Sequence, residues 1–372
     1  MHNIAIISYN YDKYSETFIH NLVKHLPFRS HYLYGGELPE YDGNRQKFLS
    51  EKGFDKVIIA LKEWVGVSRY TQHQQAVEKY LLKHEIKAIH ANYAITAFPL
   101  MDICLRNNIP LIVHFRGWTA YRSTTLEKYR KDYDHLFDMA KAVVCVSHDM
   151  KKQLMSLGCP ENKIQIIPSG ANTEIFTYSD HSANPPVFLS AGRFCDTKNP
   201  HLSILAFSKA LKQIPEAKLI MVGGDENLLC ACVSLCKALK VEDKVIFKGV
   251  VTQQEIFELM KNSLAYVQHS AVTILNEKEG TPNSVMEACS SGLVVIATRH
   301  AGIMDVIIEE ETGLLCNEFD VDAMAANMVR VAKDRALANK MGMQASKRVG
   351  EHFTMKQCIE KLSAVIEQAI SK

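Results

Sequence analysis

Residues 279–298 read EGTPNSVMEACSSGLVVIAT, and this stretch decides the fold. Gly280 and Pro282 prevent a helix from beginning earlier, so the sequence predicts a loop followed by a helix over residues 283–291. Residues 294–297, VVIA, then form a short continuous apolar run. An apolar strand beside an amphipathic helix is typical of a parallel sheet that is covered on both faces.

The same alternation extends over the whole chain in two rounds. In the first round, strands are predicted at residues 3–8, 31–34, 57–60, 88–91, 111–115, 142–147 and 164–167. In the second round, strands are predicted at residues 186–191, 218–222, 244–248, 265–268, 294–297 and 313–315. Helical patterns separate them, for example at residues 17–26, 71–84, 97–107, 148–157, 200–213, 253–262, 283–291 and 321–334. The fold class is therefore α/β, with two doubly wound, Rossmann-like parallel sheets.

The two rounds define the expected domains. We expect an N-terminal domain over residues 1–170 and a C-terminal domain over residues 171–354. The stretch 168–186, rich in turn-forming residues, would join them. A last helix within residues 355–372 follows the completed second sheet and is a candidate to pack back on the first domain. Ligands bind at the carboxyl ends of parallel strands, so the two sheets should face a central cleft.

The bulk composition excludes several classes of protein. The chain has 372 residues, of which 47% are hydrophobic and 23% charged, as in globular proteins. Its net charge of +2 gives no reason to expect nucleic acid as a partner. Ten cysteines without regular spacing, and no signal peptide, indicate a cytoplasmic protein with reduced thiols. No apolar run reaches the roughly 18 residues that a membrane-spanning helix needs.

Residues 44–67 mix basic side chains with bulky apolar ones, as interfacial segments do. Gly53 and the apolar run at residues 57–60 interrupt any single helix, which favours a loop and a core strand. Peripheral contact with the inner face of a membrane is the alternative.

Two acids mark the loop and helix quoted above. The loop delivers Glu279, and the helix places Glu287 just over one turn in. The backbone N–H groups around Gly280 and Thr281 are free to bind an anion at the helix N-terminus. A carboxylate beside them can accept hydrogen bonds from the paired hydroxyls of a sugar or a ribose. An ordinary surface helix with an acid in its first turn is the alternative.

This segment resembles the E-x7-E motif of family 4 glycosyltransferases, which have the GT-B fold. The matching positions include Glu279, Gly280, Pro282, Glu287, Ala288, Gly292, Ala297 and Thr298. The chain departs at Leu293–Val294, where the family usually has a proline at the second position. The resemblance implies a catalytic role for Glu279 near the donor sugar and ribose binding by Glu287. It also implies transfer of a hexose with retention of anomeric configuration.

A second segment, residues 190–200, carries two cations where a strand ends. Arg193 and Lys198 lie five residues apart and suit a diphosphate, whose charge rises as the sugar leaves. Two solvated cations beside a turn are the alternative. The family pattern G-R-x-x-x-x-K-N/G is matched here, which implies that Arg193, Lys198 and the backbone at Gly280 and Thr281 bind the donor diphosphate. No metal and no cofactor are then expected, and the donor is a nucleotide sugar such as a UDP- or GDP-sugar.

The first half is expected to hold the acceptor. Ser15, Glu16 and Thr17 follow the loop after the first strand, and Ser15 or Thr17 can cap the next helix. The string S-E-T-F-I resembles a subset of family 4 that builds exopolysaccharide and lipopolysaccharide. These three residues are candidates for contact with the acceptor or the sugar, with capping alone as the alternative.

Further candidates follow two central strands. Many relatives have a histidine near the anomeric centre at the position of Arg116, and His114 lies two residues earlier on the same strand face. Either residue is a candidate for catalysis, while His114 could equally be a core residue. His90 and Asn92 end a neighbouring strand and are candidates for contact with acceptor or sugar, or for packing.

Together these features predict a retaining, metal-independent glycosyltransferase for surface polysaccharide, acting on a saccharide or lipid-linked acceptor. Two alternatives remain open at this point. One is a nucleotide-sugar epimerase of GT-B fold that does not hydrolyse its substrate, and the other is a non-catalytic sugar-nucleotide-binding protein.

Overall fold

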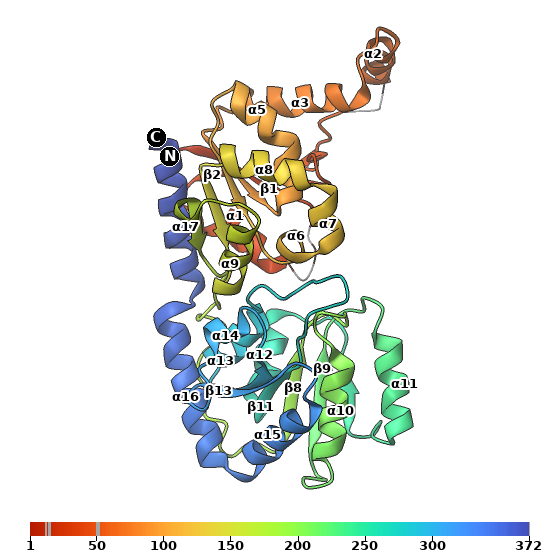
Figure 1. The fold of residues 1–372 in the computed structure, drawn as a ribbon, viewed down its shortest axis with the longest axis vertical. Helices are drawn as coiled ribbons and strands as arrows, with labels where there is room; N and C mark the ends of the chain where they lie inside the picture. Colours follow the sequence, from red (N-terminus) through yellow and green to blue (C-terminus); the bar gives the residue numbers. More distant parts are fainter. Residues whose placement is uncertain (12, 14–15, 50–52, 372) are drawn as a thin grey trace.

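The computed structural model describes residues 1–11, 13, 16–49 and 53–371, with side chains described throughout except at 53–56. It contains two α/β domains, one above the other in Figure 1. The predicted fold class is confirmed. The strands expected from the sequence are found to within one or two residues at their ends, with a single exception described below.

The first sheet has seven strands in the order β3-β2-β1-β4-β5-β6-β7. Its strands are β1 Asn3–Ser8, β2 Arg29–Tyr34, β3 Tyr41–Asp42, β4 Ala88–Asn92, β5 Leu111–His114, β6 Ala142–Cys145 and β7 Ile164–Ile166. All neighbouring pairs are parallel except β2 and β3. The winding direction reverses between β1 and β4, so the loops after these two strands border a crevice.

The second sheet has six strands in the order β10-β9-β8-β11-β12-β13, and all of its pairs are parallel. Its strands are β8 Val187–Ala191, β9 Lys218–Val222, β10 Val245–Phe247, β11 Ala265–Gln268, β12 Val294–Thr298 and β13 Gly313–Cys316. Here the reversal lies between β8 and β11, and the loops after these strands therefore form the binding edge.

Helices cover both sheets. Those of the first half are α1 Thr17–His25, α2 Gly53–Trp64, α3 Arg69–Lys83, α4 Ala94–Ala97, η2 Phe98–Leu100, α5 Met101–Arg106, α6 Trp118–Tyr121, α7 Ser123–Lys128, α8 Arg130–Met139, α9 His148–Ser156 and η3 Glu161–Lys163. Those of the second half are α10 Pro200–Ala210, α11 Leu229–Leu239, α12 Gln253–Lys261, α13 Asn283–Ser290, α14 Ile303–Val306, α15 Val321–Lys333, α16 Arg335–His352 and α17 Met355–Ser371.

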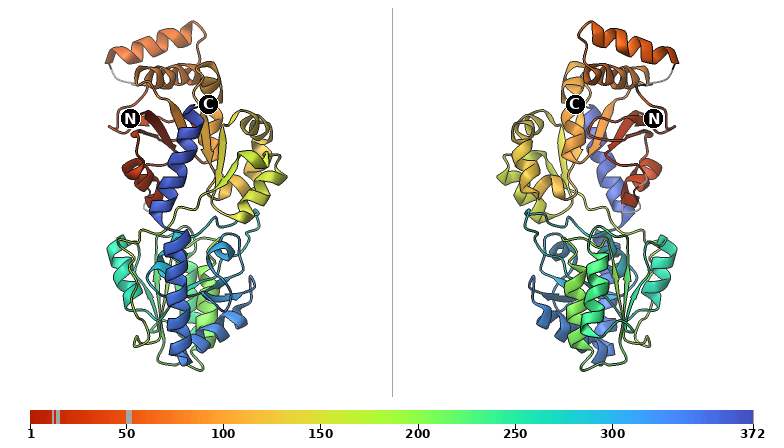
Figure 2. Two further views of the ribbon diagram at one scale, coloured as in Figure 1. Left: turned by 90° about the vertical axis from the view of Figure 1, so that its left-hand side faces the viewer. Right: turned by 90° about the vertical axis from the view of Figure 1, so that its right-hand side faces the viewer.

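The helix α17 leaves the second domain and packs on the first, as the side views in Figure 2 show. It lies against β4 and β5, and Leu362 and Ile366 are fully buried in the core of the first domain. The chain thus crosses between the domains twice, and the two crossings touch. Ala171 and Met355 take part in backbone hydrogen bonds there, and a Cβ at Gly170 would lie 2.3 Å from the Thr354 carbonyl carbon.

The exception among the strands is residues 57–60, which form part of the helix α2 and not a strand. The run VIIA is apolar in every position, and such a short run does not distinguish a strand from a helix. The helical periodicity appears only over a longer window. Val57, Leu61 and Trp64 fall on one face at spacings of four and three residues, and their exposed fractions are 51%, 59% and 85%.

Candidate active site

A cleft of about 1040 Å³ lies between the carboxyl ends of the two sheets. Its lower wall comes from the loops after β8, β9 and β11 and from the start of α13. Its upper wall comes from the loop after β1, the start of α1 and the loop after β5. The sequence-predicted residues Glu16, Thr17, Arg116, Arg193, Lys198, Glu279, Gly280, Thr281 and Glu287 all line this cleft.

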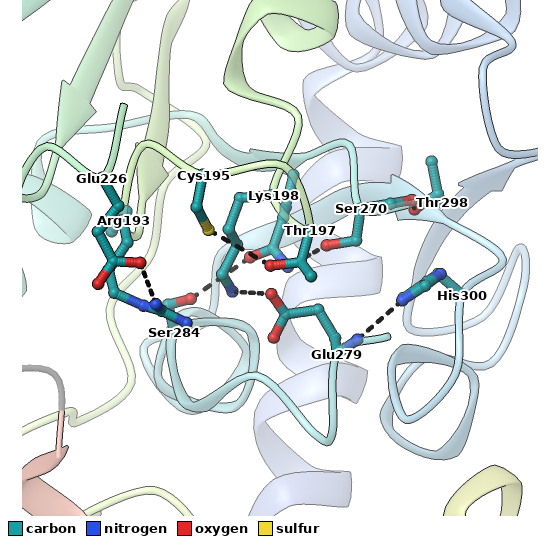
Figure 3. A network of polar contacts seen from close by, with 12 residues as sticks. Arg193, Cys195, Thr197, Lys198, Glu226, Ser270, Glu279, Ser284, Thr298 and His300 are labelled. Carbon is teal, nitrogen blue, oxygen red and sulfur yellow. Dashed lines mark hydrogen bonds and ion pairs between the residues drawn. The ribbon is translucent and has the colours of Figure 1, made fainter. Parts of the chain in front are cut away.

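The loop after β8 supplies two cations to the lower wall. Arg193 makes an ion pair with Glu226 of the loop after β9 (Figure 3). Lys198 Nζ lies 3.3 Å from Glu279 Oε1, and each of these side chains is 13% exposed. The loops after β8 and β9 approach so closely that a Cβ at Gly223 would lie 1.8 Å from the Gly192 carbonyl oxygen. Glycine at position 223 is therefore required by this contact.

A hydrogen bond from its backbone N–H helps to fix the position of Glu279. Its N–H donates to His300 Nε2 over 3.0 Å (Figure 3). His300 Nδ1 lies 2.6 Å from Glu318 Oε1. Because Nε2 accepts, the proton of a neutral His300 is on Nδ1 and is donated to Glu318. The chain Glu318–His300–Glu279 fixes the loop from two elements that lie 20 and more residues further along the sequence. The role of Glu318 has no local signal in the sequence.

Glu287 projects from α13 into the same cleft. Burial raises the pKa of its carboxyl to about 7, and the charge of Lys198 opposes this shift. No described side chain caps the N-terminus of α13, so the N–H groups of Asn283 and Ser284 are available to an anion. Ser284, in that first turn, accepts a hydrogen bond from the Tyr266 hydroxyl over 2.8 Å.

In the upper wall, Arg116 is held by neutral groups. Its Nε donates to Asn92 Oδ1 over 2.9 Å, and its Nη1 donates to Ser169 Oγ over 3.0 Å. Its Nη2 lies 3.1 Å from His114 Nδ1, and its guanidinium stacks 4.2 Å from the Phe18 ring centroid. Arg116 therefore has a fixed position at the cleft surface.

His114, His90 and Asn92 do not line the cleft and lie behind Arg116. His90 Nε2 is 3.2 Å from His114 Nδ1, and both rings are buried. Burial, with the nearby charge of Arg116, lowers the pKa of His90 to about 3 and that of His114 well below its usual value. Both rings are thus neutral at physiological pH.

The start of α1 also differs in detail from the expectation. Glu16 is the N-cap residue, and no described side chain caps the helix, which corrects the expected capping by Thr17. Ser15 lies outside the described residues. The Glu16 carboxylate accepts from Asn10 Nδ2 over 2.9 Å and from the Tyr93 hydroxyl over 3.1 Å. These bonds tie α1 to the loops after β1 and β4.

The loop that carries Glu279 also joins the two domains. Glu277 Oε1 lies 2.8 Å from Arg122 Nε, and Lys278 Nζ lies 3.2 Å from Asp149. The Thr281 hydroxyl donates to the Val146 carbonyl over 2.5 Å. These contacts between the domains therefore also help to fix the loop that places Glu279. No local pattern in the sequence indicates these pairs, because the partners are more than 120 residues apart.

Two family models match the chain. The model named Glycosyltransferase Family 4 matches residues 15–175, and the model named Glycosyl transferases group 1 matches residues 172–348. The two matches follow each other and together include nearly all of both sheets. The chain belongs to glycosyltransferase family 4.

Characterised relatives of this family 4 enzyme are distant. The amylovoran biosynthesis glycosyltransferase AmsK of Erwinia amylovora is 27% identical over 256 residues, 68% of this chain and 63% of AmsK. The chain thus matches less than two thirds of the length of AmsK. A UDP-Gal:α-D-GlcNAc-diphosphoundecaprenol α-1,3-galactosyltransferase of Escherichia coli is 23% identical over 317 residues, 79% of each chain.

Among solved structures, HepE of Anabaena, in complex with UDP and glucose, is similar to this glycosyltransferase over its full length. The TM-score is 0.77 at 14% sequence identity, with 99% of this chain and 100% of HepE covered. This similarity identifies the fold as GT-B. No helix in the described part of the glycosyltransferase is both long and apolar enough to cross a bilayer.

Proposed function

We propose that this glycosyltransferase transfers a hexose from a nucleotide diphosphate sugar to a saccharide or lipid-linked acceptor, with retention and without a metal ion, in the synthesis of a surface polysaccharide. The observation that carries the proposal is the convergence of Arg193, Lys198, Glu279 and Glu287 on one cleft at the N-terminus of α13. These residues come from separate segments, and two cations, two acids and a helix start together suit a nucleotide diphosphate sugar.

The donor occupies the lower wall, formed by residues 171–354. Arg193 and Lys198 bind the diphosphate together with the backbone at Gly280 and Thr281, and Glu287 accepts hydrogen bonds from the ribose hydroxyls. Lys198 and Glu279 form an ion pair. A diphosphate that approaches Lys198 competes with this pair, which frees Glu279 to meet the hydroxyls of the donor sugar.

The acceptor occupies the upper wall, formed by residues 1–170. Glu16, Thr17 and Arg116 line the cleft there and are placed to contact it. His114, His90 and Asn92 do not reach the cleft, so in this proposal they position Arg116 and do not touch the ligands.

Transfer with retention is then a displacement on one face of the donor sugar. The bond between the anomeric carbon and the phosphate oxygen breaks, and the acceptor oxygen forms its bond on the same face. The departing phosphate takes the proton of the acceptor hydroxyl. Arg193 and Lys198 stabilise the charge that develops on this phosphate, and in this way they supply the charge compensation that a metal ion gives in other enzymes.

For the donor nucleotide we propose uridine diphosphate, since HepE, which has the same fold, was solved with UDP. For the acceptor, the E. coli relative is named for a sugar linked to diphosphoundecaprenol, which supports a lipid-linked saccharide. Amylovoran synthesis by AmsK supports a role in surface polysaccharide.

A thermal-shift panel of UDP-, GDP- and ADP-sugars tests the donor site. A ligand at 100 times its dissociation constant stabilises a protein by about 2.7 kcal/mol, so the correct nucleotide raises the melting temperature clearly. If none of them does, the donor site is refuted. Activity that is lost on chelation would count against the metal-free mechanism.

Two incubations separate the proposal from its alternatives. The first contains the donor alone, and conversion of the donor to its epimer there would establish an epimerase. The second contains the donor with a lysate that supplies acceptors, and glycosyl transfer is expected. Binding without any turnover in the second incubation would establish a non-catalytic binding protein.

We further propose that the enzyme is cytoplasmic and contacts the inner face of the membrane through α2. This helix lies at the far end of the first domain, away from the second (Figure 1). Val57, Leu61, Trp64 and Val65 are all more than half exposed, with Lys62 beside them. An exposed apolar face with a tryptophan suits a lipid interface. Binding to vesicles of anionic phospholipid should be lost in Trp64→Glu and kept in Leu82→Glu, a control on the next helix. Equal binding by both variants would refute the contact.

A further inference from the structure

Six cationic side chains of the described residues line the cleft, and five of them already face a carboxylate. Lys13 and Arg193 contact Glu226, Arg122 contacts Glu277, Lys198 contacts Glu279, and Lys278 contacts Asp149. Among the described residues, no carboxylate lies within ion-pair distance of the sixth, Arg116. The charge of Glu16, an acid of the upper wall, acts on Arg116 from beyond that distance, and the Glu16 carboxylate itself accepts hydrogen bonds from Asn10 and Tyr93.

The partners of Arg116 are all neutral, and this distinguishes it from the other five cations. Asn92, Ser169 and the phenyl ring of Phe18 carry no charge, and His114 is buried and uncharged at neutral pH. Burial lowers the pKa of Arg116 to about 10, so the guanidinium still carries its positive charge. Glu16 acts on this charge only from beyond ion-pair distance, so the half-buried guanidinium has no carboxylate in contact, and an anionic group of a ligand can supply that contact.

The neutral partners also orient the group. Nε donates to Asn92, Nη1 donates to Ser169 and Nη2 donates to His114. One N–H hydrogen is therefore left on each of the two terminal nitrogens of the guanidinium. A fixed guanidinium with a remaining N–H donor on each terminal nitrogen can bind the two oxygens of a carboxylate or a phosphate. A lysine in this position would keep the charge but lose the paired geometry.

We propose that Arg116 binds a negatively charged oxygen group, a phosphate or a carboxylate, that is part of the acceptor. This proposal rests on the proposed function, and it specifies the class of acceptor. The anion belongs to the acceptor because every side chain that holds Arg116 comes from the upper wall, while the donor diphosphate has its own two cations in the lower wall. The acceptor is therefore a phosphorylated saccharide or one that contains a uronic acid.

The test measures the binding of small anionic sugars while UDP saturates the donor site. The probes are glucose 1-phosphate and glucuronate, with methyl glucoside as the neutral control, and affinities are measured by ligand-observed NMR. The wild type is expected to bind one anionic probe at least tenfold more tightly than methyl glucoside. The anionic probe that binds more tightly than methyl glucoside identifies the anion as phosphate or carboxylate.

Arg116→Gln should weaken binding of that probe by about 10- to 100-fold and leave the affinity for UDP unchanged, because one charge-assisted pair is lost. Arg116→Lys should recover part of the loss, and UDP binding reports that both variants are folded. Arg122→Gln is the matched control, because Arg122 lies in the same cleft but is already paired with Glu277. It should change probe binding by less than about twofold.

Three results would overturn the proposal. The wild type could fail to prefer either anionic sugar over methyl glucoside. Arg122→Gln could weaken binding of the probe as much as Arg116→Gln does, which would show a general charge effect. Arg116→Gln could weaken UDP binding by the same factor as probe binding, which would assign Arg116 to the donor. A wild type that does not bind UDP at all refutes instead the proposed donor site, so the two failures are distinguishable.

Discussion

The cations compared in the two walls of the cleft have different kinds of partner. In the lower wall, Arg193 and Lys198 face Glu226 and Glu279, so each cation already has a carboxylate. In the upper wall, Arg116 faces an amide, a hydroxyl, an imidazole and an aromatic ring. The cations of the lower wall therefore have carboxylate partners before any ligand arrives, and Arg116 of the upper wall has none in contact.

The two walls are therefore suited to different ligands. A ligand entering the lower wall must exchange one charge interaction for another, which favours a strong anion such as a diphosphate. A ligand entering the upper wall meets Arg116, a cation in a fixed position without a carboxylate in contact. Substitutions in each wall should separate these two cases.

The largest effect is expected for Glu279→Ala. Turnover of the UDP-sugar should fall by about 100- to 1,000-fold, as when one preorganised polar group is removed from an active site. UDP affinity should change little, because Glu279 is assigned to the sugar and not to the nucleotide. Steady-state kinetics and UDP titration separate the two effects. The matched control is Glu277→Gln, two residues earlier in the same loop, and a control as slow as Glu279→Ala would assign the effect to loop closure.

The next effect concerns the diphosphate. Lys198→Ala should weaken UDP by about 10- to 100-fold, equivalent to about 1.5–3 kcal/mol for one charge-assisted contact. Calorimetric titration measures the change. Lys278→Ala is the control, because Lys278 lines the same cleft but pairs with Asp149 across the domains. An unchanged UDP affinity in Lys198→Ala would remove Lys198 from the donor site.

A smaller effect follows from the pKa of Glu287, which burial raises to about 7. The ionised carboxylate accepts hydrogen bonds from both ribose hydroxyls. Because this carboxylate becomes protonated as the pH drops from 8 to 6, affinity for a UDP-sugar should fall up to about tenfold. Titration at several pH values tests this. Glu287→Gln should bind weakly and independently of pH, and a variant that keeps the wild-type pH profile would contradict the assignment.

The same raised pKa has an effect on stability with the opposite sign. Without ligand, the native state binds an extra proton between pH 4.5, the usual pKa of this group, and about 7. The contribution of Glu287 to the free energy of unfolding therefore decreases as the pH rises through this window. Denaturant titrations should show the decrease in the wild type and its absence in Glu287→Gln.

The smallest effect is expected for His300, which touches Glu279 only through the backbone. His300→Leu removes one acceptor and one donor and should destabilise the fold by about 1–3 kcal/mol. Turnover should fall by about 5- to 10-fold, consistent with a contact worth about 1 kcal/mol in the transition state. His300→Gln retains an acceptor and should recover part of both. Recovery of stability without recovery of turnover would limit His300 to a structural role.

The sequence predicts which side chains line the lower wall because these residues lie close together along the chain. Glu279 and Glu287 lie eight residues apart around one helix start, and Arg193 and Lys198 lie five apart around one turn. The continuous apolar runs that predict the strands are local as well. The prediction of a strand at residues 57–60 is wrong because it also rests on a short stretch. Four apolar residues are too few to distinguish the period of a helix from that of a strand.

The upper wall could not be predicted in this way. Arg116 is fixed by Asn92, 24 residues earlier, and by Ser169, 53 residues later. The sequence makes His114 a candidate for the reaction because it precedes Arg116 by two residues, yet the His114 ring is buried behind Arg116. Only the folded sheet, which brings β4, β5 and the end of the first domain together, determines which side chain reaches the ligand.

The packing of α17 has a consequence for how the chain matures. Leu362 and Ile366 fill the core of the first domain, although nearly the whole second domain is synthesised before them. A nascent chain that has completed the second sheet still exposes the apolar bed of α17 on β4 and β5. The first domain therefore becomes stable only after α17 has been synthesised, later than the second domain. A chain truncated before Met355 should retain a foldable second domain and aggregate through the first.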